Sequence, residues 1–126
     1  MTFTESVSVC FKKYFVFQGR ASRSEYWWFQ LIVAPAYLIF EITESESSPV
    51  SYLFLVITIL TLIPAISAGV RRLHDTNKSG FYLLLGFIPF IGGLILLFFL
   101  ITDGTKGKNQ YGENPLIKKR SRKKKK

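Results

Sequence analysis

The sequence predicts an all-α integral membrane protein, a small helical bundle with two secure transmembrane helices and a third apolar segment. First, the 126-residue chain is 48% hydrophobic and 16% aromatic, more than a soluble domain of this length needs. Second, charged connections separate three apolar stretches, residues 26–40, 50–70 and 81–101. Third, eight of the seventeen Lys and Arg residues lie within residues 118–126, so the formal charge of +9 belongs mainly to the tail.

We expect one membrane domain, residues 1–117, followed by a disordered polybasic tail, residues 118–126. A run of basic residues without apolar ones cannot bury enough surface to fold. Within the domain, the pattern predicts an amphipathic segment, two helices and a further helical segment. Their expected bounds are 6–18, 24–42, 50–76 and 80–102.

The N-terminal segment has one apolar face if it forms a helix. That face consists of Val7, Cys10, Phe11 and Tyr14. Such a helix would lie in the membrane interface, with Lys12 and Lys13 reaching the lipid headgroups. A disordered terminus is the alternative interpretation, and the sequence leaves both open.

The first two apolar stretches predict transmembrane helices. Residues 50–70 comprise 21 positions without a charge, and as a helix they would reach about 31 Å, which matches the hydrocarbon core of a bilayer. Residues 26–40 are shorter, but the flanking Glu25 and Glu41 sit where an interface can hydrate them. A soluble protein is disfavoured, because so short a chain has too little polar sequence to cover three such segments.

Charges outside the apolar stretches predict the orientation. The segments before the first helix and after the second are basic, whereas residues 41–49 hold three glutamates and no Lys or Arg. By the positive-inside rule the N-terminus is cytoplasmic and the 41–49 loop is outside. We therefore expect a multi-pass membrane protein with its N-terminus in the cytoplasm.

The third apolar stretch conflicts with this rule. If residues 81–101 crossed the membrane, the ten basic residues after them would have to lie outside. Pro89 removes a helical hydrogen bond, and Gly92 and Gly93 remove side-chain constraint, so the stretch can break near its middle. Two alternatives remain open: a kinked full span, and a re-entrant hairpin that returns the tail to the cytoplasm.

Charged residues at the cytoplasmic ends of the helices form the candidate site, which we call the polar collar. The polar collar consists of Arg20, Arg23, Glu25, Arg71, Arg72, His74, Asp75 and Lys78. Interface anchoring and ion pairing between helices is the simpler interpretation of this set. Binding of a polar ligand is the alternative.

Two carboxylates in the polar collar have expected partners. The sequence SRSE, residues 22–25, matches a capping box, and Arg20 and Arg23 are expected to neutralise its glutamate. Asp75 falls on one helix face with His74 if the second helix continues past residue 70. The expected partner of Asp75 is Arg71, Arg72 or Lys78.

The composition argues against catalysis. His74 and Cys10 are the only histidine and cysteine, so one chain cannot build a zinc site from Cys and His ligands. The adjacent His74 and Asp75 resemble part of a metal-dependent phosphohydrolase site, but the further histidines that such a site needs do not occur. No phosphate-binding or dinucleotide fingerprint occurs either. We expect no enzyme activity, no metal and no cofactor.

The expected role is a non-enzymatic structural, regulatory or partner-binding component of the membrane. One alternative is a small oligomeric transporter or channel, although the central spans offer it only the hydroxyls of Thr58, Thr61 and Ser67. The other alternative is a membrane enzyme that acts on lipid headgroups.

The expected partner is the bilayer itself, and within it the anionic lipids. Lipid headgroup contacts are expected from Lys12, Lys13, Lys118, Lys119, Arg120 and Arg122. A membrane-protein partner or a second copy of the chain is a further candidate. Nucleic acid is disfavoured.

Three motifs carry a family resemblance. FQGRASRSEYWWF, RRLHDTNKSG and GTKGKNQYGENP occur in this order between the apolar stretches. The chain resembles, over residues 11–115, the YhaH-like family of small bacterial inner-membrane proteins of unknown function. It departs from the family pattern at Phe81 and Tyr82, where members have a tryptophan pair, and at Lys106, where they have proline. The resemblance implies an integral inner-membrane protein and no particular reaction.

Overall fold

The computed structural model describes residues 1–46 and 48–117, which form helices joined by short connections and contain no β-strand. The expected all-α fold is confirmed for this part of the chain. The expectations for residues 118–126, namely disorder and headgroup contacts, lie outside the described residues. The headgroup residues concerned are Lys118, Lys119, Arg120 and Arg122.

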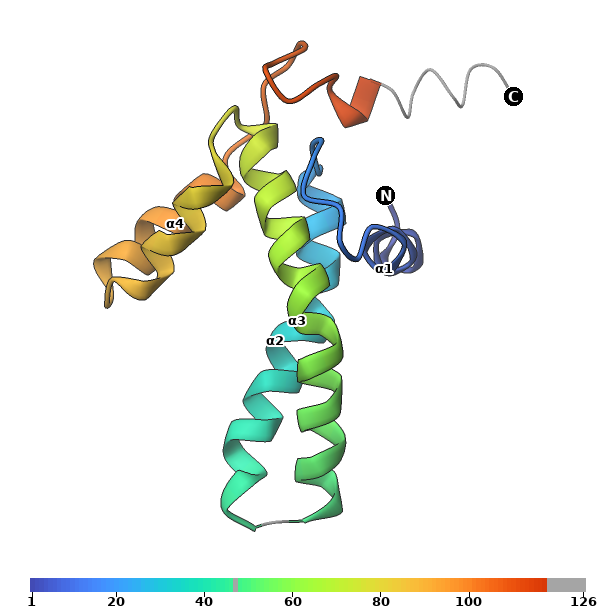
Figure 1. The fold of residues 1–126 in the computed structure, drawn as a ribbon, viewed down its shortest axis with the longest axis vertical. Helices are drawn as coiled ribbons and strands as arrows, with labels where there is room; N and C mark the ends of the chain where they lie inside the picture. The colour runs from blue at the N-terminus through green and yellow to red at the C-terminus, as the bar shows by residue number, and fades with distance from the viewer. Residues whose placement is uncertain (47, 118–126) are drawn as a thin grey trace.

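Two hairpins and a short crossing helix make up the molecule (Figure 1). Helices α2 (Arg23–Thr43) and α3 (Pro49–Asp75) form the long hairpin, whose loop contains a 3₁₀ turn, η1 (Glu44–Glu46). Helix α1 (Phe3–Lys12) lies across the upper half of this hairpin, and α4 (Ile91–Ile101) diverges from it on the other side.

Helix α1 is an ordered helix that begins and ends before the expected 6–18 segment does. Thr2 caps it, because the Thr2 hydroxyl accepts a hydrogen bond from the Glu5 N–H at 3.2 Å. Its buried Ser6 and Cys10 face α2, because both side chains donate to the backbone carbonyl of Glu25 in the first turn of α2.

Helices α2 and α3 lie within one residue of the expected bounds at each end. Ser22 and Ser48 cap them, with each hydroxyl accepting from the N–H three residues later at 3.3 Å. Among the described helices, α3 alone is long and apolar enough to cross a membrane. Helix α2 has 21 residues but includes Glu25 and Glu41, and its crossing stays a prediction.

The third apolar stretch folds back on itself. A 3₁₀ helix, η2 (Gly80–Phe87), is followed by a turn and by α4, which packs against it. Phe90 has a left-handed φ of 61° at this turn. A Cβ at Gly92 would collide with the Leu85 carbonyl, so only glycine lets the two arms approach this closely. The expected helical segment over 80–102 is thus divided into two arms joined by a turn. Of the two alternatives, the fold of this stretch matches the hairpin, and its place in the membrane stays a prediction.

Both ends of this second hairpin lie beside the last turns of α3. At its start, a Cβ on Gly80 would come within 2.7 Å of Val70 Cγ1, so the two residues are in direct contact. At its end, the Leu100 carbonyl accepts a hydrogen bond from Arg72 Nε at 2.9 Å. The chain therefore leaves the hairpin at the same end of α3 where it entered (Figure 1).

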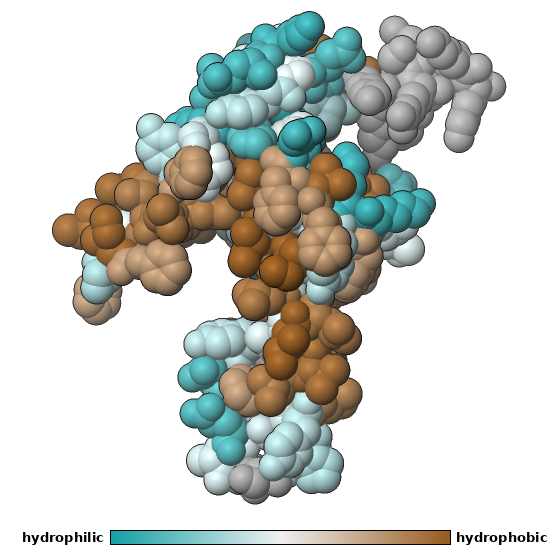
Figure 2. All heavy atoms as spheres, in the orientation of Figure 1, coloured by the Kyte–Doolittle hydropathy of each residue, from teal (hydrophilic) through white to brown (hydrophobic). Residues whose placement is uncertain are grey.

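The apolar interior is small. Its clusters consist of Cys10, Phe29 and Ala68, and of Tyr26, Leu73 and Leu100. The largest fully buried side chains are instead Arg71 and Arg72. Most large apolar side chains face outward, and Figure 2 shows them gathered between a polar upper end and a polar loop at the bottom. This distribution is typical of a protein whose middle lies in lipid.

A hydrogen bond from Tyr14 ties the N-terminal segment to the middle of α3. Pro64 lies inside α3 and has no N–H, so the Leu60 carbonyl, four residues earlier, loses its helical partner. The Tyr14 hydroxyl donates to this carbonyl at 2.9 Å. Close by, the Ser67 hydroxyl donates to the Lys13 carbonyl at 3.3 Å. Because lipid offers no water to an unpaired carbonyl, Tyr14 satisfies a group that the proline leaves open.

We predict that Tyr14→Phe destabilises the protein by about 1 kcal/mol, because one net hydrogen bond is lost. In a Pro64→Ala background the Leu60 carbonyl regains a helical N–H donor, so the same substitution should cost much less. Unfolding of the four proteins in detergent, analysed as a double-mutant cycle, measures the difference. An equal cost in both backgrounds would contradict the pairing of Tyr14 with the carbonyl freed by Pro64.

Candidate functional site

The polar collar is a cluster at the end of the long hairpin where α2 begins and α3 ends. Its buried members are Arg20, Glu25, Arg71, Arg72, His74 and Asp75. They come from the connection before α2, the first turn of α2 and the last two turns of α3. Arg23 and Lys78 lie at its edge. The structure thus brings together the greater part of the set that the sequence singled out.

Asp75 binds two arginines. Its Oδ1 accepts from Arg20 Nε at 2.9 Å, and its Oδ2 accepts from Arg72 Nη1 at 2.5 Å. Both side chains of the Arg20–Asp75 pair are almost fully buried. Of the three expected partners, Arg72 is confirmed, while Arg71 and Lys78 bind elsewhere. Arg20 replaces them because the connection before α2 crosses over the end of α3, which no helical spacing could indicate.

Glu25 has two roles. Its N–H donates to the Ser22 hydroxyl at 3.3 Å, as the capping box predicts. Its carboxylate Oε2 accepts from Arg71 Nη1 at 2.7 Å, which joins α2 to α3 through a buried ion pair. The expected neutralisation of Glu25 by Arg20 and Arg23 is therefore wrong, because Arg71 on the neighbouring helix points directly at this carboxylate.

Arg23 forms a surface ion pair instead. Its Nη2 lies 2.7 Å from Asp103 Oδ1, and the two side chains are 56% and 79% exposed. Lys78 also lies outside the buried ion pairs, with its ammonium group 4.8 Å from the centre of the Phe99 ring. These two residues mark the rim of the polar collar.

Backbone carbonyls satisfy most of the remaining arginine donors. Arg20 donates to carbonyls of the 103–117 segment, and Arg72 donates to carbonyls at the end of α4 and before α2. The carbonyls concerned belong to Thr105, Gly107 and Gly112 for Arg20, and to Ala21, Leu100 and Thr102 for Arg72. The two arginines therefore hold the 103–117 segment and the second hairpin against the long hairpin.

The 103–117 segment also approaches Asp75 through its own backbone. The Thr105 N–H donates to the Asp75 carbonyl at 2.8 Å. A Cβ on Gly104 would collide with the Asp75 carboxylate, so this close approach requires glycine. Asn109 Nδ2 donates to the His74 carbonyl at 2.9 Å and so caps the end of α3. Sequence analysis missed Asn109, although its position in a Gly- and Asn-rich turn was a signal for such backbone contacts.

His74 is held on two sides. Its Nδ1 lies 3.0 Å from the Gly19 carbonyl, and its ring stacks on Tyr111 with centroids 3.8 Å apart and planes 3° apart. Gly19 has a φ of +91°, which places its carbonyl toward the imidazole and suits glycine alone. The ring is therefore a packed part of the polar collar, with a carboxylate partner on neither side among the described residues.

The remaining chemistry of the site is limited. In the described part of the chain, no three His, Cys, Asp or Glu side chains converge as metal ligands would. Burial raises the pKa of the Cys10 thiol to about 11, so this cysteine is protonated and a poor nucleophile at neutral pH. One buried donor is left over: Arg71 Nη2 has no hydrogen-bond partner among residues 1–46 and 48–117.

Comparison with known proteins gives a family and two close relatives. The family model described as "Protein of unknown function (DUF805)" matches residues 14–113. The chain is 44% identical to the inner membrane protein YhaI of Escherichia coli over 105 residues, which is 82% of this chain and 89% of YhaI. It is 35% identical to the inner membrane protein YhaH of the same organism over 111 residues, 84% of this chain and 92% of YhaH. No solved structure matches it.

We predict that Asp75→Asn destabilises the protein by about 3–5 kcal/mol, because it strands the charges of two buried arginines. The matched control is Asp103→Asn, which removes the exposed partner of Arg23 and should cost less than about 1 kcal/mol. Unfolding of both variants in detergent measures the two values. Similar losses for the two substitutions would show that burial of the Asp75 pairs does not govern stability.

Proposed function

Because the chain belongs to the DUF805 family of unknown function, with inner-membrane relatives, we propose that it is a non-enzymatic membrane scaffold. Its helices anchor a small cytoplasmic cap, which we define as the polar collar together with residues 103–117. The cap is the surface that a membrane-bound partner would contact. One observation carries this proposal: the buried charged groups of the polar collar form ion pairs and hydrogen bonds with one another and with the backbone of the cap.

The buried ion pairs support a structural role over a catalytic one. A catalytic carboxylate or histidine needs access to substrate, whereas both collar carboxylates are buried and each accepts from arginine. The nearby thiol is protonated, and His74 is stacked and hydrogen-bonded to the backbone. No group of the polar collar is left poised as a base or nucleophile.

A transporter is less well supported. Thr58 and Thr61 lie in the middle of α3, but their hydroxyls donate to carbonyls of the same helix at 2.7 and 2.9 Å. Hydroxyls that bond within their own helix leave no continuous set of polar groups for an ion or solute. The transporter hypothesis would require a path for the ion or solute between several copies of the chain.

The second hairpin supports a re-entrant membrane topology. Its arms, η2 and α4, reach only about 16 Å each, roughly half of a hydrocarbon core of about 30 Å. Its exposed tip is strongly apolar, with Phe87 84% and Phe90 89% exposed. We infer that the hairpin enters the inner leaflet from the cytoplasmic side and returns. The N-terminus, the cap and the tail would then be cytoplasmic and the 41–49 loop outside, in keeping with the positive-inside rule.

We predict that reporters fused after Ser79 and after Lys126 both read cytoplasmic, while a reporter fused after Ser47 reads external. The physical reason is that only α2 and α3 would cross, and the second hairpin would return. Paired phosphatase and fluorescent-protein fusions measure the side of each site. An external reading at Lys126 would show that residues 81–101 cross the membrane.

We predict that a photo-crosslinking amino acid at Gln110, on the exposed surface of the cap, gives a discrete protein adduct in native membranes. The control position is Ile59, which is 58% exposed in the middle of α3 and should contact lipid only. Gel analysis and mass spectrometry identify the adducts.

The competing functions have their own readouts. Purified protein in liposomes is expected to show neither ion flux nor lipid turnover. An activity that vanishes in His74→Phe, a variant that keeps a ring stacked on Tyr111, would replace the scaffold proposal with a transporter or an enzyme.

A further inference from the structure

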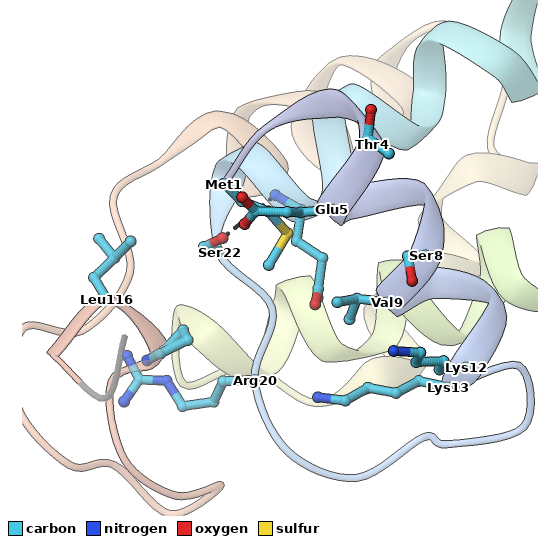
Figure 3. Close-up of a pocket in the computed structure, with 12 residues that line it drawn as sticks. Met1, Thr4, Glu5, Ser8, Val9, Lys12, Lys13, Arg20, Ser22 and Leu116 are labelled. Atoms are coloured by element: carbon cyan, nitrogen blue, oxygen red, sulfur yellow. Dashed lines mark hydrogen bonds between the residues drawn. The ribbon is translucent and has the colours of Figure 1, made fainter. Parts of the chain in front are cut away.

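A cavity of about 760 Å³ lies between α1, the start of α2 and residues that lead into the C-terminal tail (Figure 3). On the α1 side, Thr4, Glu5, Ser8 and Lys12 line it, and the spacing of four residues places Thr4, Ser8 and Lys12 on one face of the helix. On the opposite side, Arg20 and Leu116 line it. Helix α1 thus packs its Cys10 face against the long hairpin and turns a polar face toward this cavity.

Of the basic residues that line the cavity, Arg20 is paired with Asp75, whereas Lys12 and Lys13 take no part in the ion pairs of the polar collar. Lys12 and Lys13 extend from the end of α1 toward the side where Arg20 and Leu116 lie (Figure 3). Neither lysine has an ion pair or a side-chain hydrogen bond in the described part of the chain. Two acidic residues, Glu5 and Glu25, also line the cavity, and Arg71 already binds the Glu25 carboxylate at 2.7 Å. The three cationic side chains of the lining, Lys12, Lys13 and Arg20, outnumber these two carboxylates.

The buried polar collar behind the cavity wall has a net positive charge, the same sign as the two lysines. The buried polar collar contains three arginines, Arg20, Arg71 and Arg72, against the two carboxylates Glu25 and Asp75. One buried positive charge is therefore in excess. The unpartnered donor, Arg71 Nη2, belongs to the residue that holds Glu25 in this wall. Cavity and wall together favour a bound anion.

The surroundings of the cavity suit a lipid more than a free anion. The volume lies within the range of about 300–1,000 Å³ typical of organic ligand sites, far more than a lone phosphate would fill. Helix α1 also carries the apolar side chains of Phe3 and Phe11, which are 40% and 42% exposed and offer apolar surface to acyl chains. Leu116 at its edge also stands two residues before the tail, which holds eight basic residues in nine positions.

We propose that this cavity binds the headgroup phosphate of an anionic phospholipid of the cytoplasmic leaflet. Lys12 and Lys13 donate to the phosphate oxygens, and the hydroxyls of Thr4 and Ser8 donate to the rest of the headgroup. Arg20 contributes its charge, because its N–H groups are already bound to Asp75 and to carbonyls. This assignment rests on the proposed function only in placing the cap on the cytoplasmic side.

The test uses the purified, delipidated full chain in a neutral detergent. Short-chain phosphatidylglycerol should raise the unfolding midpoint in a saturable way, while phosphatidylcholine with the same chains and inorganic phosphate should not. The double variant Lys12→Gln, Lys13→Gln should raise the half-saturating concentration about tenfold or more. The control variant, Lys106→Gln with Lys108→Gln, loses the same charge at exposed positions away from the cavity and should bind as the parent does.

Three further measurements separate the site from other causes. Maleimide labelling of Cys10 should stay slow in the Lys12 and Lys13 variant, which shows that α1 remains packed. Deletion of residues 118–126 should leave the saturable midpoint shift in place, because the cavity and not the tail supplies the ligands. An equal effect of inorganic phosphate, or equal losses in both double variants, would overturn the proposal.

The outcome is independent of the orientation of the protein, because the assay is made in detergent. If the reporter after Lys126 reads external and phosphatidylglycerol still raises the unfolding midpoint, the proposed topology is refuted and the lipid site stands. If this reporter reads cytoplasmic and phosphatidylglycerol has no effect, the lipid site is refuted and the scaffold proposal stands.

Discussion

The carboxylate of Asp75 is the interaction on which the rest of the structure depends. It stands at the last residue of α3 and accepts from Arg20 and Arg72. Arg20 in turn holds the 103–117 segment, and Arg72 holds the end of α4. Few apolar contacts join these parts, since the buried clusters are small. The buried carboxylate of Asp75 therefore joins the end of α3, through its two arginines, to the connection before α2, the end of α4 and the 103–117 segment.

Arginine suits this arrangement for a reason that lysine does not share. A guanidinium has five donors in a fixed plane, so one side chain can bind a carboxylate and several carbonyls at once. Arg72 does this with Asp75, Ala21 and Leu100. Carbonyls carry partial negative charge and need donors themselves when they are buried. The buried charges and the irregular backbone of the cap thus satisfy each other, which explains how a polar cluster replaces an apolar core.

Local signals in the sequence predicted the two long helices and part of the site. The capping box at Ser22 and the apolar runs predicted α2 and α3 to within one residue, and the helical spacing offered Arg72 as one of three candidate partners of Asp75. The partner of Asp75 from outside the helix, Arg20, and the partner of Glu25, Arg71, depend on how separate segments cross in space. The sequence could not indicate which backbone carbonyls accept from the arginines, because every residue has a carbonyl. Helical spacing predicts contacts within one helix and does not predict contacts between separate segments.

The depth of the polar collar follows from the same energetics. Burying three arginines in hydrocarbon would be costly, whereas headgroups and water are available at the interface. Residues 50–70 of α3, which carry no charge, precede Arg71, and 21 helical residues are long enough to span the hydrocarbon core of a bilayer. Under the proposed topology this length brings the collar to the membrane surface. Both ends of the second hairpin contact the last turns of α3, through Val70 and Arg72. Its two arms therefore begin and end at the same level of the molecule. A stretch of 21 apolar residues that would suffice for a full span instead turns near its middle, at Phe90, and returns to the end of α3 where it began.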